Sequence, residues 1–249
     1  MSLKGKSAII TGANKNLGQK TALAFAEEGC DLLVHCHNPK FKKDLDSFAE
    51  ELKKDYGIKA VSFQGDLTQE APNKEMFELA SSKLGKIDIA INNVGMVLRK
   101  PLAEVSLDEY NAMFDINTKA AFLFLREAAN KLAENGSVIM LTTSLLAAYT
   151  DGYSIYQAAK SGVEFMCKAL SKETKKQISF NCISPGPMDT PFLYGQETKE
   201  RVEFFKTQAS AGRLTKVEDI IPIIKFLAKD GHWITGQNIF CSNGFTAPK

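Results

Sequence analysis

Long hydrophobic runs are missing from this chain of 249 residues. No apolar stretch approaches the roughly 20 residues that a membrane-spanning helix requires. Only three consecutive apolar residues precede the turn at Gly12, too few for the core of a signal peptide. We therefore expect a cytoplasmic protein that has no membrane partner.

An excess of charge of one sign is also missing, because 31 Lys and Arg residues face 29 Asp and Glu residues and leave a formal net charge of +2. Nucleic-acid binding needs concentrated cations against the phosphates, so we expect no nucleic-acid partner. Low-complexity tracts are absent, and the apolar fraction of 44% is typical of a globular protein. We expect a single domain over residues 1–249.

Cysteine and histidine are few. The five cysteines are scattered and form no C-x-x-C pair, which predicts reduced thiols. His35, Cys36 and His37 form the one cluster that suggests a metal, but no second ligand group lies nearby in the sequence, so we expect no metal. A G-x-S-x-G motif is absent and no histidine stands beside Ser144 in the expected order of elements, which argues against a serine hydrolase.

What the sequence does contain is a regular alternation of short apolar runs and longer amphipathic stretches. The runs predict strands buried on both faces of a parallel sheet, at Ser7–Thr11, Asp31–Cys36, Ala60–Gln64, Ile87–Asn92, Ser137–Thr142, Ile178–Ile183 and Asn238–Cys241. Helices are expected near Leu17–Glu28, Lys42–Lys54, Lys74–Leu84, Leu107–Ala133, Ser154–Lys175 and Val217–Ala228, with capping boxes at Ser106/Glu109 and Thr215/Glu218. The fold class is therefore α/β, a doubly wound Rossmann-type domain with about seven strands and helices on both faces. In such a sheet the ligand lies beyond the carboxyl ends of the strands.

The first strand leads into a turn that suits a phosphate, with the sequence Thr11-Gly12-Ala13-Asn14-Lys15-Asn16-Leu17-Gly18. Glycines let backbone amides approach a pyrophosphate, and the helix that follows attracts its charge. Asn16 replaces a middle glycine, but asparagine tolerates positive φ better than most residues. The predicted cofactor contacts here are Gly12, Asn14, Lys15, Asn16, Leu17 and Gly18. An ordinary strand–helix turn is the alternative.

Two further strand ends carry polar groups. Asp66, followed by Leu67, is placed to meet an adenine amino group, although it could instead cap the next helix. The fourth strand ends in Asn92-Asn93-Val94-Gly95, which could alternatively form only a turn. We expect Asp66, Leu67, Asn93, Val94 and Gly95 to contact the cofactor.

Tyr156 and Lys160 form a Y-x-x-x-K pattern inside an expected helix. Residues four apart share a helix face, so the phenol and the ammonium group can converge. A neighbouring cation would lower the pKa of the tyrosine and make it a usable acid near neutrality. Thr142, Thr143 and Ser144 supply hydroxyls at the end of the fifth strand.

Taken together, these motifs resemble the short-chain dehydrogenase/reductase family over essentially the whole chain. The resemblance rests on T-G-x(5)-G at Thr11–Gly18, N-N-x-G at Asn92–Gly95, Asn117, the hydroxyl near Ser144, Tyr156 with Lys160, Pro185-Gly186 with Thr190, and the tail Ile234-Thr235-Gly236-Gln237 before Ser242-Asn243-Gly244. Asn16 and Val94 depart from the commonest wording of these motifs.

The resemblance implies hydride transfer between a nicotinamide and a carbonyl or alcohol carbon. Tyr156 would be the general acid, Ser144 would bind the same substrate oxygen, and Lys160 would hold the nicotinamide ribose. The resemblance further implies a proton-relay water on Asn117, nicotinamide contacts from Pro185, Gly186, Met188 and Thr190, and a homo-oligomer, a tetramer or dimer. The alternative is a protein of the same fold that binds the cofactor as a regulator or scaffold without turnover.

Cofactor choice follows from the end of the second strand. Enzymes of this fold that prefer NAD place an acidic residue there for the ribose 2′-hydroxyl. Here the strand ends in His35-Cys36-His37-Asn38 without a carboxylate. Lys15 could pair with a 2′-phosphate, helped by His37 or Asn38, so we expect NADP(H) in preference to NAD(H).

The sequence offers two candidates for the catalytic hydroxyl. Many members of the family place it thirteen residues before the tyrosine, which here is Thr143. We nevertheless expect Ser144, because adjacent strand residues point to opposite faces and an unbranched serine suits an exposed strand end. Thr143 remains the alternative.

The substrate pocket is expected to be apolar and partly aromatic. Its predicted lining is Met96, Leu145, Leu146, Tyr153, Pro187 and Phe192, with Leu193 and Tyr194 beside them. A lining with so few charges favours a small neutral ketone, aldehyde or secondary alcohol. Ordinary packing is the alternative reading for each of these residues.

Overall fold

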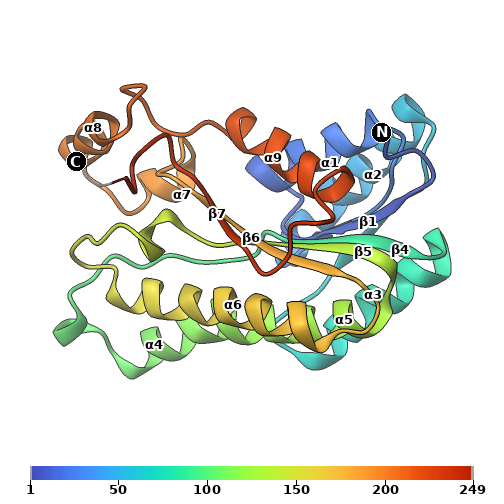
Figure 1. Ribbon diagram of the computed structural model, residues 1–249, viewed down its shortest axis with the longest axis horizontal. Helices are drawn as coiled ribbons and strands as arrows, with labels where there is room; N and C mark the ends of the chain where they lie inside the picture. The colour runs from blue at the N-terminus through green and yellow to red at the C-terminus, as the bar shows by residue number, and fades with distance from the viewer. Residues whose placement is uncertain (1, 248–249) are drawn as a thin grey trace.

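The computed structural model describes residues 2–247 and contains a parallel sheet of seven strands between two layers of helices (Figure 1). The strands are β1 (Ser7–Ile10), β2 (Asp31–Cys36), β3 (Ala60–Gln64), β4 (Ile87–Asn92), β5 (Leu132–Leu141), β6 (Ser179–Pro185) and β7 (Asn238–Cys241). Their order across the sheet is β3-β2-β1-β4-β5-β6-β7, and every neighbouring pair is parallel. The predicted fold class is confirmed.

The helices divide between the two faces of the sheet. They are α1 (Asn16–Ala26), α2 (Lys42–Tyr56), α3 (Glu70–Leu84), α4 (Leu107–Phe114), α5 (Ala120–Lys131), α6 (Ser154–Glu173), α7 (Pro191–Tyr194), α8 (Lys199–Gln208) and α9 (Val217–Lys229). Figure 1 shows α1, α2 and α9 on one face and α3, α5 and α6 on the other. Along β1, Ala8 and Ile10 pack into the first layer while Ile9 packs into the second, which is why the strands lack polar alternation.

Several details differ from the expectation. The long helix predicted over Leu107–Ala133 is two helices separated by a π-helical segment, Asp115–Lys119, and its last two residues belong to β5. Short α7 and polar α8 were not predicted. Ser106 and Glu109 form the expected capping box, but α9 is capped one residue later than predicted, because Asp219, and not Glu218, accepts the N–H of Lys216.

None of the helices among residues 2–247 is long and apolar enough to cross a membrane.

The strand order reverses between β1 and β4, which places a crevice at the carboxyl ends of these two strands. The segments that follow β4, β5 and β6 extend from the same edge, and α7 and α8 lie there (Figure 1). The chemistry predicted from the sequence belongs at this edge.

Candidate active site

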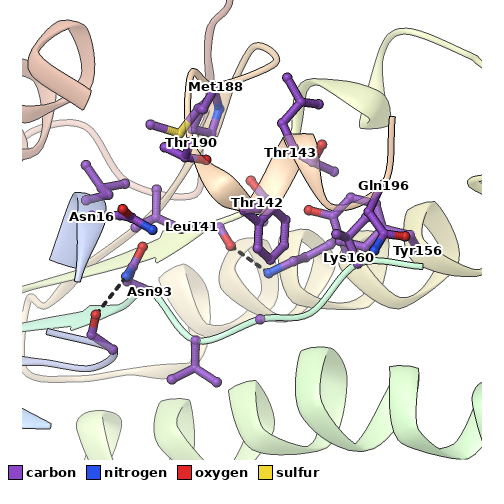
Figure 2. A pocket seen from close by; sticks show the side chains of 18 of the residues that line it. Asn16, Asn93, Leu141, Thr142, Thr143, Tyr156, Lys160, Met188, Thr190 and Gln196 are labelled. Carbon is purple, nitrogen blue, oxygen red and sulfur yellow. Dashed lines mark hydrogen bonds between the residues drawn. The ribbon is translucent and has the colours of Figure 1, made fainter. Parts of the chain in front are cut away.

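A cavity of about 460 Å³ lies at the carboxyl edge of the sheet (Figure 2). It is continuous from the turn after β1, marked by Asn16, to Tyr156 and Lys160 on α6. Met188 and Thr190, which follow β6, form another part of its wall. A single elongated cavity thus joins the predicted phosphate turn to the predicted catalytic pair.

The turn between β1 and α1 has the geometry that the sequence predicted. Asn16 adopts a left-handed conformation with φ of 46°. Gly18 must be glycine, because a Cβ there would lie 2.2 Å from the carbonyl oxygen of Gly12. No described side chain caps the start of α1, which leaves its first N–H groups available to an anion.

His35 holds this turn from the neighbouring strand. Its Nδ1 accepts the N–H of Gly12 at 3.3 Å, and its Nε2 lies 3.0 Å from the carbonyl oxygen of Gly65 at the end of β3. These partners require the neutral tautomer that carries its proton on Nε2. Burial lowers the pKa of His35 to about 4, which keeps the imidazole neutral. The backbone carbonyl of His35 also accepts the N–H of Ala13 at 2.8 Å.

The two asparagines after β4 have different roles. Buried Asn92 accepts the Thr11 hydroxyl at 3.2 Å and the Val94 N–H at 2.9 Å, so it shapes the turn. Asn93 lines the cavity, and its side-chain amide donates to the carbonyl of Gly12 at 3.4 Å (Figure 2). The strand ends of β1 and β4 are thereby joined directly below the cavity.

Tyr156 and Lys160 are both buried in the cavity wall, 6% and 5% exposed. Lys160 Nζ donates to the carbonyl of Leu141 at 3.0 Å (Figure 2), and burial lowers the pKa of Lys160 to about 8. The expected lowering of the Tyr156 pKa by Lys160 is wrong. Burial raises the pKa of Tyr156 to about 12, and only a hydrogen bond with Thr143 opposes that rise.

The two candidate hydroxyls differ in their relation to Tyr156. Thr143, the alternative to the expected Ser144, is the residue whose side chain lowers the Tyr156 pKa. Thr143 keeps an extended backbone (φ −154°, ψ 143°) beyond the end of β5, whereas Ser144 begins a 3₁₀ turn. Thr143 Oγ1 also accepts the N–H of Leu145 at 3.2 Å, which fixes its position. Both side chains line the cavity.

Asn117 lies in the π-helical segment and is 1% exposed. Its side-chain amide bonds both the N–H and the carbonyl of Met96, at 3.2 and 3.0 Å, and donates to the carbonyl of Met113 at 3.0 Å. A Cβ on Gly95 would lie 3.0 Å from Asn117 Oδ1 and 2.9 Å from Lys160 Nζ. Gly95 therefore allows Asn117 and Lys160 to approach the same point.

At the other end of the cavity the predicted cofactor residues separate into two groups. Lys15, His37 and Asn38 line the cavity, together with Phe41, which the sequence analysis did not single out. Asp66 and Leu67 do not. The Asp66 carboxylate accepts the N–H and the hydroxyl of Thr68, so it closes a turn and does not cap α3 as the alternative had it, and Leu67 packs in the core.

The comparison with known proteins agrees with this geometry. A family model described as enoyl-(acyl carrier protein) reductase matches residues 12–246. A short-chain type dehydrogenase/reductase of Picea abies is 32% identical over 97% of this chain and 93% of its own length. This chain belongs to the short-chain dehydrogenase/reductase family. It is therefore an oxidoreductase.

Two further relatives of this short-chain dehydrogenase/reductase have names or structures that include the cofactor NADP(H). An NADPH-dependent aldehyde reductase-like protein, chloroplastic, of Arabidopsis thaliana is 32% identical over 98% of this chain and 95% of its own length. A Burkholderia cenocepacia protein whose crystal structure contains NADP superposes with a TM-score of 0.94 at 40% identity, over 99% of this chain and 96% of that one.

Most of the predicted site residues line this cavity of the short-chain dehydrogenase/reductase. They are Gly12, Asn14, Lys15, Asn16, Leu17, His37, Asn38, Asn93, Val94, Gly95, Ser144, Leu145, Tyr153, Tyr156, Lys160, Pro185, Gly186, Pro187, Met188, Thr190, Phe192 and Leu193. Gly18, Asn117, Asp66, Leu67, Met96, Leu146 and Tyr194 stand outside the lining. Gly18 and Asn117 lie directly behind it, and Tyr194 donates its hydroxyl to Asp189 at 2.6 Å.

Several residues of the wall were not predicted from the sequence: His35, Phe41, Val97, Leu141, Gln196 and Phe205. Gln196 and Phe205 belong to the α7–α8 region, whose short and polar helices carry little apolar periodicity. Among these residues, only His35 had a signal in the sequence that could have predicted its role, because it is a polar residue inside an otherwise apolar strand.

Proposed function

We propose that this enzyme interconverts a small neutral carbonyl compound and its alcohol by hydride transfer, using NADP(H) in preference to NAD(H), with Tyr156 as the general acid and base. The main support is the continuous cavity that has Lys15 near one end and the buried Tyr156 and Lys160 at the other. The NADPH named for the Arabidopsis relative and the NADP in the Burkholderia structure point the same way.

The chain's own residues fit such a dinucleotide. The uncapped start of α1 would take the pyrophosphate, and the glycine at position 18 leaves the space that a side chain would fill. Lys15 is exposed at the cavity and, with His37 and Asn38, would hold a 2′-phosphate. Phe41 is 41% exposed at the same end and would cover the adenine. When bound, the nicotinamide supplies or accepts the hydride.

The protein would supply position and a proton. Tyr156 stays protonated at neutral pH because burial raises its pKa to about 12, so it is a donor to a developing alkoxide. Thr143 would hydrogen-bond the same oxygen. Lys160 would bind the ribose and return a proton to Tyr156, since a pKa of about 8 lets it exchange protons near neutrality.

The direct test is consumption of NADPH by the purified protein with a panel of neutral aldehydes, ketones and diketones, and the reverse assay with alcohols. Tyr156→Phe keeps the ring but removes the proton donor, so we expect turnover to fall by about 10²–10⁴-fold. The melting temperature and NADPH affinity should stay near those of the wild type. Binding of NADPH without consumption on any substrate would favour the regulator or scaffold instead, and normal turnover of Tyr156→Phe would contradict the assigned proton donor.

A further inference from the structure

The substrate end of the cavity is enclosed by three segments that are far apart in the sequence. They follow β4 (residues 93–101), β5 (142–153) and β6 (186–208). Backbone groups connect them: the N–H of Lys100 donates to the carbonyl of Gly152 at 2.8 Å, and the N–H of Arg99 donates to Gln196 Oε1 at 3.0 Å. All three segments therefore meet at one place.

Glu197 is the centre of this meeting point. Its carboxylate is fully buried, although the residue stands between two exposed segments. It accepts the Tyr153 hydroxyl at 2.5 Å and Arg201 Nε at 2.7 Å, and Arg99 Nε lies 3.7 Å away. Burial and the bond to Glu197 raise the pKa of Tyr153, so its phenol remains a donor to Glu197.

Arg99, Asp151, Glu197 and Arg201 form a cluster in which the charges balance. Asp151 accepts from Arg99 Nη2 at 2.6 Å and from Arg201 Nη1 at 3.0 Å. Two guanidinium groups thus face two carboxylates, one from each of the segments after β5 and β6. A buried carboxylate left without its partners is strongly unfavourable, so movement of any one segment away from the others is opposed.

The cluster acts on the cavity through its neighbours. Glu197 does not line the cavity, but Tyr153 and Gln196 do. The Tyr153 ring packs edge-on against Tyr156 with centroids 6.2 Å apart. Arg201 also lies over the ring of Phe205, another wall residue, at 5.5 Å.

We propose that Glu197 is a positioning residue for the substrate, which holds Tyr153 and Gln196 in the cavity wall before any substrate binds. The wall is then preorganised, so little ordering is left to oppose substrate binding. This inference rests on the proposed reductase function.

Glu197→Gln tests it, because glutamine keeps the size of the side chain and removes its charge. The matched control is Glu203→Gln on α8, where the exposed carboxylate pairs only with Lys206 among the contacts of the described residues. In Glu197→Gln we expect the KM for the carbonyl substrate to rise about tenfold, which corresponds to roughly 1.4 kcal/mol, while the Kd for NADPH and the kcat stay near the wild-type values. Glu203→Gln should change none of the three.

Tyr153→Phe and the double variant complete a cycle on the substrate KM. If Glu197 acts through Tyr153, the two changes combine to less than the product of their separate effects. If Glu197→Gln lowers the melting temperature but leaves the substrate KM unchanged, the inference is overturned and Glu197 is a purely structural group. Effects of the two substitutions on KM that simply multiply would also overturn it.

A second readout does not need turnover. Trypsin should cleave Glu197→Gln faster than wild type or Glu203→Gln after Lys199 and Arg201, because cleavage requires local opening of this segment. Equal cleavage rates would contradict the inference. If wild type reduces no carbonyl compound, the proposed function fails while the proteolysis still decides whether Glu197 closes the segment.

Discussion

At the level of single residues, the proposed chemistry depends on Thr143 and Tyr156. Thr143 Oγ1 accepts the N–H of Leu145, and the Thr143 side chain lowers the Tyr156 pKa that burial raises. A hydroxyl fixed in this way is suited to bind the substrate oxygen as charge develops on it.

Single substitutions separate the two hydroxyls. Removing a donor to a developing oxyanion costs about 10²–10³-fold in kcat, so we expect Thr143→Ala to lose about that much and Thr143→Ser to recover most of it. Ser144→Ala should stay within about tenfold of wild type, because Ser144 already turns into the 3₁₀ segment. Steady-state kinetics at saturating NADPH measures all three, and a larger loss in Ser144→Ala would restore the assignment expected from the sequence.

Lys15 is the second residue whose role can be isolated. If its ammonium pairs with a 2′-phosphate, Lys15→Glu should reduce the preference for NADPH over NADH by roughly 10–100-fold in kcat/KM, since hydrogen bonds to charged groups contribute about 1.5–3 kcal/mol. Lys54→Glu is the control, with the same charge change at an exposed site on α2 outside the cavity lining. An unchanged preference in Lys15→Glu, or better kinetics with NADH in wild type, would contradict the assignment.

At the level of elements, His35 shows how one buried polar side chain connects three strands' ends. It lies on β2, accepts from the turn after β1 and donates to the carbonyl after β3. The π-helical segment has a comparable role on the other side of the site, because it directs Asn117 toward the backbone of Met96.

Neutral His35 predicts a pH dependence of stability. Its pKa in the folded chain is about 4 and its ordinary value 6.5, so the unfolded chain binds more protons between these two pH values. The free energy of unfolding should therefore rise with pH from 4 to 6.5, by up to roughly 3 kcal/mol from this residue. Urea unfolding of wild type and His35→Asn across this range measures it: the difference between the two should grow with pH, and parallel curves would contradict the prediction.

At the level of the whole molecule, one sheet and its two helix layers carry the cavity, whose wall extends from Gly12 to Phe205. Ion pairs between distant segments strengthen this unit, as where Glu28 after α1 pairs with Lys225 and Lys229 of α9. Ligand binding to such a cavity should stabilise the whole domain.

Thermal unfolding should show this as a single transition that moves upward with cofactor. At a concentration of about 100 Kd, NADPH adds about 2.7 kcal/mol, which corresponds to roughly 5–10 °C in Tm for a domain of this size. NADH at the same concentration should give a smaller shift. Calorimetry or circular dichroism is the suitable probe, because Trp233, the single tryptophan, is 95% exposed. Equal shifts with both cofactors would contradict the preference.

The sequence alone predicted the number and order of the strands along the chain, the main helices, the phosphate turn and the Tyr156/Lys160 pair. These features depend on short-range patterns: apolar runs, residues four apart on a helix, and an asparagine that accepts the left-handed conformation at position 16. They can therefore be read from neighbouring residues alone.

Three outcomes required the folded structure: the Thr143 side chain lowers the Tyr156 pKa, burial raises that pKa, and Asp66 closes a turn with Thr68. The folded structure alone brought Phe41, Gln196 and Phe205 to the cavity wall and buried Glu197 between two arginines. Each of these outcomes depends on desolvation or on partners that are distant in the chain, and neither leaves a local pattern in the sequence.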